Sequence, residues 1–136
     1  MKNIIYLILI STLALFTSCS MKDTLVGSWK IEDASITVRN GQNITPDHSE
    51  LGGITFYKDG SFVSEGSFSF TDSYIEKLDD SSYQGQWDCN DKYSQMKIDE
   101  CLWKVEIIDD SRIELRATVQ RLSEGTREYY CLLRKE

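Results

Sequence analysis

Trp103-Lys104-Val105-Glu106-Ile107 and Ile113-Glu114-Leu115-Arg116-Ala117-Thr118-Val119 are the two stretches of sequence that decide the fold. In both of them apolar side chains alternate with mostly polar ones, which is the pattern of a β-strand with one buried face and one solvated face. Asp109-Asp110-Ser111 lies between them and is typical of a tight turn, so the pair predicts an antiparallel hairpin. A second turn, Ser123-Glu124-Gly125, leads into a third strand over residues 127–134 and completes a meander.

Five more strands are predicted upstream, and they cover residues 28–39, 53–57, 61–70, 82–88 and 95–99. In the first of these the apolar phase changes from Trp29 and Ile31 to Ile36 and Val38, which predicts a bulge or bend near residues 32–34. Lys58-Asp59-Gly60 is a strong hairpin signal between the second and third. About eight short strands predict an all-β fold, an antiparallel up-and-down barrel.

Two connections carry helix signals. Thr45-Pro46-Asp47 is a helix start and Gly52 suits the exit, so a short helical turn is expected over residues 46–51. Ser73 with Glu76 three residues later fits a capping box, although residues 74–78 equally suit a strand. The barrel is therefore expected to carry one or two short helical turns in its loops.

The N-terminus has the layout of a secretory signal, with Lys2 before an apolar run over residues 4–16. That run is shorter than the roughly 17 to 25 residues that span a bilayer. Phe16-Thr17-Ser18-Cys19 resembles a bacterial lipobox, which implies cleavage before Cys19 and lipidation of its sulfur. An unlipidated signal peptide and a signal anchor are the alternatives.

These features predict a lipoprotein signal peptide over residues 1–18, a lipidated tether over 19–24 and one barrel domain over 25–136. The expected location is the bacterial cell envelope. Ser20 after the lipidated cysteine is compatible with the outer membrane, and the periplasmic and surface faces both remain open. The predicted contact with the membrane is the lipid anchor alone.

The chain of 136 residues has a formal net charge of −7. Such an acidic surface repels phosphates, so we expect no nucleic-acid partner. Of the four cysteines, Cys19 is assigned to the lipid, which leaves an odd number. Cys89 and Cys101 would lie near opposite ends of a hairpin, about 15 Å or more apart, too far for a disulfide. We therefore favour free, buried thiols at Cys101 and Cys131, with any bridge left open.

Residues for catalysis or for metal binding are scarce. His48 is the only histidine and lies in a loop, so nucleophilic chemistry that needs a positioned base is not expected. Asp47, His48 and Glu50 lack the fixed elements of a zinc site. The stretch 88–91 lacks the glycine and the terminal glutamate of a calcium loop. We expect no metal, no cofactor and no enzymatic activity.

Gly27-Ser28-Trp29, together with the hairpin over residues 55–62, resembles the lipocalin and wider calycin group, in particular the lipocalin-like lipoproteins of Bacteroidetes-type bacteria. The resemblance implies that Trp29 closes the barrel floor beneath a basic residue of the last strand. Arg134 is the best match for that residue, with Lys135 and Arg127 as alternatives. The resemblance also implies that the connection over residues 42–52 covers the barrel opening.

The aromatic side chains admit two interpretations: a filled core, or the walls of a pocket for a small apolar ligand. Trp103 and Phe56 are the predicted ligand contacts within that set. Arg127 and Tyr129 share one face of the last strand and would hold a carboxylate if that face is the inner one. The alternative is that Glu128 and its phase point inward.

The expected function is non-enzymatic: a lipid-anchored cell-envelope protein that binds a small hydrophobic or amphipathic ligand. The alternative is a protein-binding module, an inhibitor or an envelope assembly subunit, with a filled barrel. An open apolar cavity would favour the first function, whereas a filled barrel with exposed apolar surface would favour the second.

Overall fold

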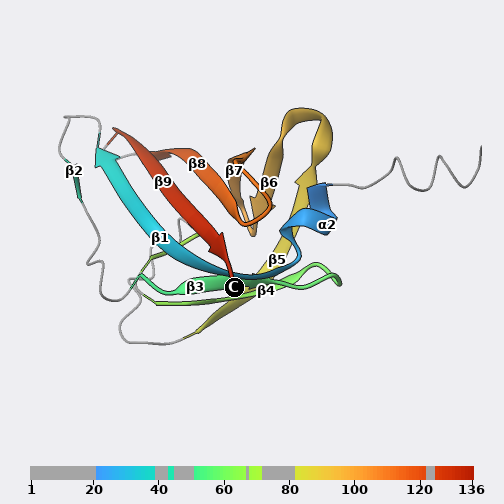
Figure 1. Ribbon diagram of the computed structural model, residues 1–136. Coiled ribbons are helices and arrows are strands. Elements are labelled where there is room, and N and C mark those ends of the chain that lie inside the picture. Colours follow the sequence, from blue (N-terminus) through green and yellow to red (C-terminus); the bar gives the residue numbers. More distant parts are fainter. Residues whose placement is uncertain (1–20, 39–42, 45–50, 67, 72–81, 122–124) are drawn as a thin grey trace, which may run out of the picture.

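The computed structural model describes residues 21–38, 43–44, 51–66, 68–71, 82–121 and 125–136 (Figure 1). The strands of these residues form one antiparallel sheet in the order β2-β1-β3-β4-β5-β6-β7-β8-β9, and β1 also pairs with β9. That last pairing closes the sheet into a barrel. The bounds are β1 Gly27–Val38, β2 Asn43–Ile44, β3 Gly53–Phe56, β4 Ser61–Glu65, β5 Tyr83–Asn90, β6 Gln95–Ile98, β7 Cys101–Ile107, β8 Arg112–Arg121 and β9 Gly125–Lys135.

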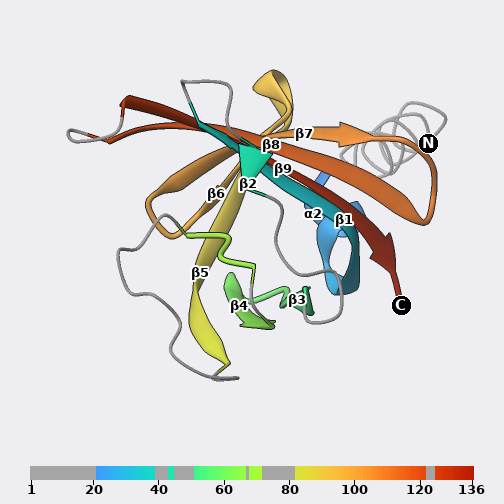
Figure 2. The same cartoon turned by 90° about the vertical axis from the view of Figure 1, so that its left-hand side faces the viewer.

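Eight of these strands make the barrel wall, and β2 is a two-residue addition beside the far end of β1. Sequence neighbours are sheet neighbours around the whole wall, as expected for an up-and-down barrel. The prediction of an antiparallel barrel of about eight strands is therefore confirmed. Figure 2 shows β1, β8 and β9 crossing the molecule as long strands, with the short β3 and β4 on the other side of the barrel.

The predicted bend in the first strand is confirmed as a β-bulge. Ile31 pairs with Leu133 and Asp33 pairs with Leu132, so Glu32 is an extra residue on β1. Trp29 and Ile31 are buried before this point, and Ala34 is buried after it. The extra residue moves the buried phase from odd to even positions, which a strand of period two cannot do without one.

One helix was not predicted, and one strand is shorter than expected. Met21–Leu25 form a short helix, α2, that overlaps the predicted tether. Leu25 is fully buried, so hydrophobic burial holds this helix on the barrel. The strand expected over residues 61–70 ends at Glu65, because Gly66 takes φ +96°, outside the range of a strand. The helical turns expected over 46–51 and 73–78 fall, apart from Leu51, outside the described residues.

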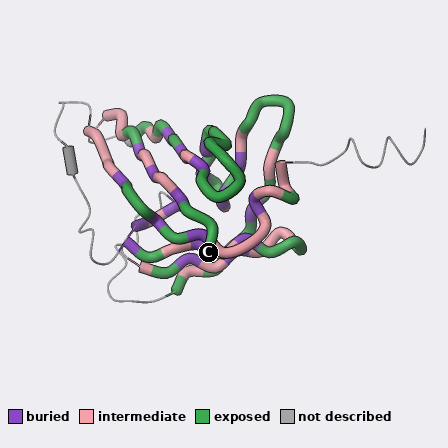
Figure 3. Tube along the Cα trace, in the orientation of Figure 1, coloured by how far each residue is buried: buried purple, intermediate pink, exposed green. Residues whose placement is uncertain are grey.

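Burial alternates along the strands, as the colouring of Figure 3 shows. The inward side chains form one hydrophobic cluster that runs through the barrel. Its largest fully buried members include two tryptophans and four phenylalanines: Trp29, Trp103, Phe56, Phe62, Phe68 and Phe70. Since about eight strands enclose a space that side chains can fill, the described part of the interior is a packed core.

Candidate functional site

The predicted floor tryptophan is in place, but the cation above it is not the predicted one. Trp29 is 1% exposed, and its indole N–H donates to the carbonyl oxygen of Leu25 at 2.8 Å. The ammonium nitrogen of Lys135 lies 5.5 Å from the centre of a Trp29 ring. Arg134 lies instead on the outer face and pairs with Glu32 at 3.1 Å. The choice of Arg134 is corrected to Lys135, because neighbouring residues of a strand point to opposite faces.

The predicted ligand contacts Trp103 and Phe56 lie in the packed core. Each is 1% exposed. The ring of Phe56 packs on Trp87 with centroids 5.0 Å apart, and the indole N–H of Trp103 donates to the carbonyl oxygen of Phe70 at 2.9 Å. Their surfaces are thus used by other protein groups.

Arg127 and Tyr129 belong to the inner face of β9, as the first of the two interpretations required. Tyr129 is buried and Glu128 is exposed, so the odd positions point inward. The Tyr129 ring meets Trp103 edge-on at 6.3 Å between centroids. Arg127, which precedes Tyr129 by two residues and shares its face of the strand, is half-buried. That these two residues hold a carboxylate stays a prediction.

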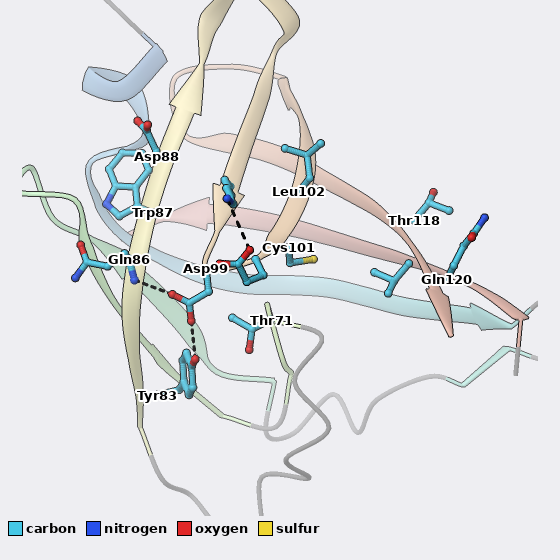
Figure 4. Close-up of a pocket in the computed structure, with 13 residues that line it drawn as sticks. Thr71, Tyr83, Gln86, Trp87, Asp88, Asp99, Cys101, Leu102, Thr118 and Gln120 are labelled. Carbon is cyan, nitrogen blue, oxygen red and sulfur yellow. Dashed lines mark hydrogen bonds and ion pairs between the residues drawn. The ribbon is translucent and has the colours of Figure 1, made fainter. Parts of the chain in front are cut away.

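A large hollow lies elsewhere, in the wall between β5 and β8 (Figure 4). It measures about 1080 Å³ and is open to solvent. We call it the β5–β8 groove. It is bordered by Tyr83 and Gln86 of β5, Asp99 of the β6–β7 turn, Leu102 of β7, and Thr118 and Gln120 of β8.

The groove lies where the β6–β7 hairpin stops pairing with its two neighbours, β5 and β8. β6 pairs with β5 only between Trp87 and Asn90, and β7 pairs with β8 only as far as the pair Lys104 and Arg116. β5 and β8 continue past these pairs, while the first three residues of β7, 101–103, have no recorded pairing with β8. The barrel wall is therefore interrupted there, and Cys101 and Thr71, both buried, lie at the bottom of the interruption.

Asp99 is the polar centre of the groove. Its carboxylate accepts the hydroxyl of Tyr83 at 2.5 Å and the backbone N–H of Gln86 at 2.9 Å. Its own backbone N–H donates to the carbonyl oxygen of Gln86 at 2.8 Å. The hydrogen bond to Asp99, followed by burial, raises the pKa of Tyr83 above its ordinary value. Asp99 thus continues the pairing of β6 with β5 for one more residue by means of its side chain.

Gly85 makes room for that carboxylate. A Cβ atom at this position would lie 2.4 Å from one carboxylate oxygen of Asp99 and 2.6 Å from the other. Asp99 itself takes φ +49°, a left-handed conformation that aspartate tolerates better than most residues. The sequence interpretation missed Gly85 and Asp99. A glycine inside a strand is the one local signal that points to a close approach there.

The described cysteines Cys89, Cys101 and Cys131 form no disulfide, as favoured from the sequence for Cys101 and Cys131. Cys101 and Cys131 are buried and Cys89 is half-buried. Burial raises the pKa of the Cys131 thiol, and burial together with Asp91 and Asp88 raises that of Cys89. Both thiols are therefore poor nucleophiles at neutral pH.

Some predicted sites cannot be placed. Cys19 and His48, with the lipobox and the lid over residues 42–52 except for its short described pieces, lie outside the described residues. Among the residues that are described, no group of three or more histidine, cysteine, aspartate or glutamate side chains is arranged to hold a metal ion. Within the same residues no helix has the length and hydropathy of a membrane span.

Comparisons with known proteins add little to this geometry. A scan against models of protein families finds no match, and a search of curated proteins finds none either. The solved structure of a redesigned beta barrel is similar over 88% of this chain and 97% of its own, with 14% identity and a TM-score of 0.47. The assignment of a barrel therefore rests on the strand pairing of this chain, and the lipocalin resemblance remains a prediction.

Proposed function

We propose that this chain is a lipid-anchored protein of the bacterial cell envelope that acts by binding a protein partner, without catalysis, through the β5–β8 groove. The observation that carries the proposal is the contrast between interior and wall. The described interior is filled by apolar side chains, whereas the wall carries a hollow of about 1080 Å³. A filled barrel favours a working surface on its outside.

The border of the groove suits a partner of some size. Leu102 is 54% exposed although it is a large apolar residue, and it lies beside the charged residues Lys97 and Glu100. Exposed apolar groups with a polar rim are typical of interaction sites. An inhibitor or an assembly subunit of the envelope fits this arrangement, as does any protein that is held at the membrane and receives a segment of another.

A small amphipathic ligand is the second candidate. Its support is the size of the hollow, which is near the upper end of the roughly 300 to 1,000 Å³ of small-molecule pockets, and the mixture of Val119 and Leu102 with polar groups. If such a ligand instead enters through the barrel mouth, Arg127 and Tyr129 would receive its carboxylate. The replacement Arg127→Leu would then weaken the binding of a fatty acid by about 1.5 to 3 kcal/mol.

The anchor is tested separately from the groove. In cells that are fed radiolabelled palmitate, the wild-type chain should incorporate label, and Cys19→Ala should not and should accumulate as precursor. Equal labelling of the two chains would contradict the lipid anchor and leave a plain signal peptide.

The groove is tested by a photo-crosslinking amino acid placed at Gln120, with Asp110 in the β7–β8 turn as the control position. Both side chains are exposed, but only Gln120 borders the groove. A protein adduct of defined mass from Gln120 alone supports the binding module. Native mass spectrometry that shows a bound small molecule would favour the second candidate, and equal adducts from both positions would contradict a role for the groove.

A further inference from the structure

Among the described residues, one edge of β8 has no recorded strand partner in the β5–β8 groove. Its ladder with β9 continues from Arg112 to Arg121, but its ladder with β7 stops at Arg116. From Ala117 to Arg121, therefore, β8 has no pairing with a described strand on the β7 side, and the first residues of β7, Cys101 and Leu102, border the hollow without pairing with β8. An unpaired strand edge is a ready template for another strand.

The backbone groups that face this gap can be identified. In an antiparallel ladder successive residues send their N–H and C=O groups to opposite sides. The carbonyl oxygen of Arg112 accepts from Ile108 on the β7 side, and that of Ser111 accepts from Lys135 on the β9 side. The backbone N–H and C=O groups of even-numbered residues in β8 therefore point toward β7. Those of Thr118 and Gln120 point into the gap. Both residues are exposed.

The opposite bank of the groove shows how such an edge is satisfied. The backbone N–H of Trp87 donates to Gly60 on the β4 side, so Gln86 faces the groove. Asp99 occupies both backbone groups of Gln86, one through its carboxylate and one through its own N–H. Gln86 is thus capped by Asp99, whereas the described residues supply no comparable cap for Thr118 and Gln120.

The side chains around the gap define the chemistry of an occupant. If a strand paired with β8, its side chains would alternate between two faces. One set would face inward, toward Cys101 and Val119, and the other would face outward, toward Leu102 and the acidic rim. That rim holds Asp88 and Glu100, and Lys97 is its one cation among the described residues, 3.8 Å from Glu100. The Glu100 side chain is 97% exposed, so its charge remains available to a partner.

We propose that the groove receives an extended segment of a partner protein, with alternating apolar and basic residues, that pairs with β8 at Thr118 and Gln120. This inference rests on the proposed binding function and names the partner's chemistry. A second copy of this chain is a poor occupant, because its net charge of −7 would meet an acidic rim. Addition of a strand to an exposed sheet edge takes its affinity from main-chain hydrogen bonds and its specificity from alternate side chains.

The test uses the full-length protein expressed in a bacterium and purified in detergent, with synthetic nonapeptides as probes. A peptide of alternating lysine and valine should bind, whereas one of alternating glutamate and valine should not. A lysine–valine peptide methylated at its backbone nitrogens on one edge should lose about tenfold in affinity or more, since it cannot donate to β8. Fluorescence anisotropy measures the dissociation constants.

Two pairs of variants locate the binding. Thr118→Pro removes a backbone N–H that faces the groove and leaves the β9 ladder intact, so it should weaken the lysine–valine peptide about tenfold; Thr118→Val is its control and should bind normally. Glu100→Lys should weaken the peptide about fivefold, whereas Asp110→Lys, the same charge change in the β7–β8 turn, should leave it unchanged.

Hydrogen exchange of backbone amides tests the proposal on the wild-type protein, and therefore still decides it if Thr118→Pro fails to fold. The amides of Thr118 and Gln120 should exchange fast in the free protein and slowly with the peptide bound. Slow exchange in the free protein would overturn the proposal, because the edge would already be paired. If the protein forms dimers that Thr118→Pro disrupts, the occupant of the groove is a second copy of this chain and the proposal of a different partner is wrong. If crosslinks from Gln120 persist while exchange and both variant pairs show no effect, strand addition fails and the binding module stands.

Discussion

The two halves of the barrel wall are built differently. β1, β8 and β9 have 12, 10 and 11 residues, and β9 is paired along nearly its whole length on both sides. β3, β4 and β6 have only four or five residues. The long-strand half leaves β9 no free edge, whereas the short-strand half ends before its neighbours do and leaves the β5–β8 groove. The proposed binding site therefore lies where the short-strand half meets the long strand β8.

The side chains follow the same division. On the outer face of the long strands the Arg116 guanidinium lies 4.9 Å from the centre of the Tyr130 ring, and the Tyr130 hydroxyl donates to Glu114 at 3.2 Å. These contacts cross from strand to strand and reinforce existing pairs. In the groove, by contrast, Asp99 replaces a missing strand residue with its carboxylate. A polar group that substitutes for backbone is sensitive to small changes around it.

The largest expected effect comes from the floor beneath the long strands. Trp29→Ala should lower the free energy of unfolding by about 3 to 5 kcal/mol, as aromatic truncations in packed cores do. It removes a side chain that is 1% exposed and whose N–H is bonded to Leu25. Urea unfolding measures the loss. An unchanged midpoint would show that the long-strand half does not depend on this residue.

A smaller effect is expected on the groove side. Gly85→Ala should displace the Asp99 carboxylate and leave the Gln86 N–H and the Tyr83 hydroxyl without their acceptor, at a cost of about 1 to 3 kcal/mol. The pKa of Tyr83 should then fall toward its ordinary value, which ultraviolet titration detects. Gln84→Ala, an exposed neighbour, is the control. If the pKa of Tyr83 does not change, the position of the Asp99 carboxylate does not depend on Gly85.

The correction at the floor predicts a difference between adjacent residues. Lys135→Ala should cost about 0.5 to 1 kcal/mol through the lost contact with the Trp29 ring. Arg134→Ala should cost less, since its ion pair with Glu32 is on the surface and such pairs contribute little. Chemical unfolding of the two variants side by side decides the order. A larger loss for Arg134→Ala would restore the original sequence prediction.

The smallest effect lies in the exposed β7–β8 turn. Hydrogen bonds from the Ser111 backbone and the Arg112 guanidinium lower the pKa of Asp109 to about 2. Because the folded state lowers this pKa, the carboxylate stabilises the fold above about pH 4 and loses that effect as the pH falls toward 2. Asp109→Asn should therefore be slightly less stable at pH 7 and indistinguishable near pH 2. A difference that persists at pH 2 would contradict the electrostatic cause.

Local sequence was enough for the strands whose two faces differ. The alternation in residues 103–107 and 113–119 predicted β7 and β8, and the phase change after Ile31 predicted the bulge at Glu32. It was not enough for the floor cation, since Arg134 and Lys135 are equally basic and only strand phase separates them. It also failed at residues 21–25, where burial of Leu25 against the barrel decides that a helix forms.

By itself, then, the sequence determined an all-β chain, its strand count, its bulge and the inward phase of its apolar residues, because these depend on periodicity and turn chemistry within a few residues. Only the tertiary structure decided the closure of β1 on β9 at a definite register, the filling of the interior by Trp103 and Phe56, and the groove where the β6–β7 hairpin stops short. Those features depend on contacts between residues far apart in the chain. Asp99 meets Tyr83 and Gly85 only after β5 and β6 have paired.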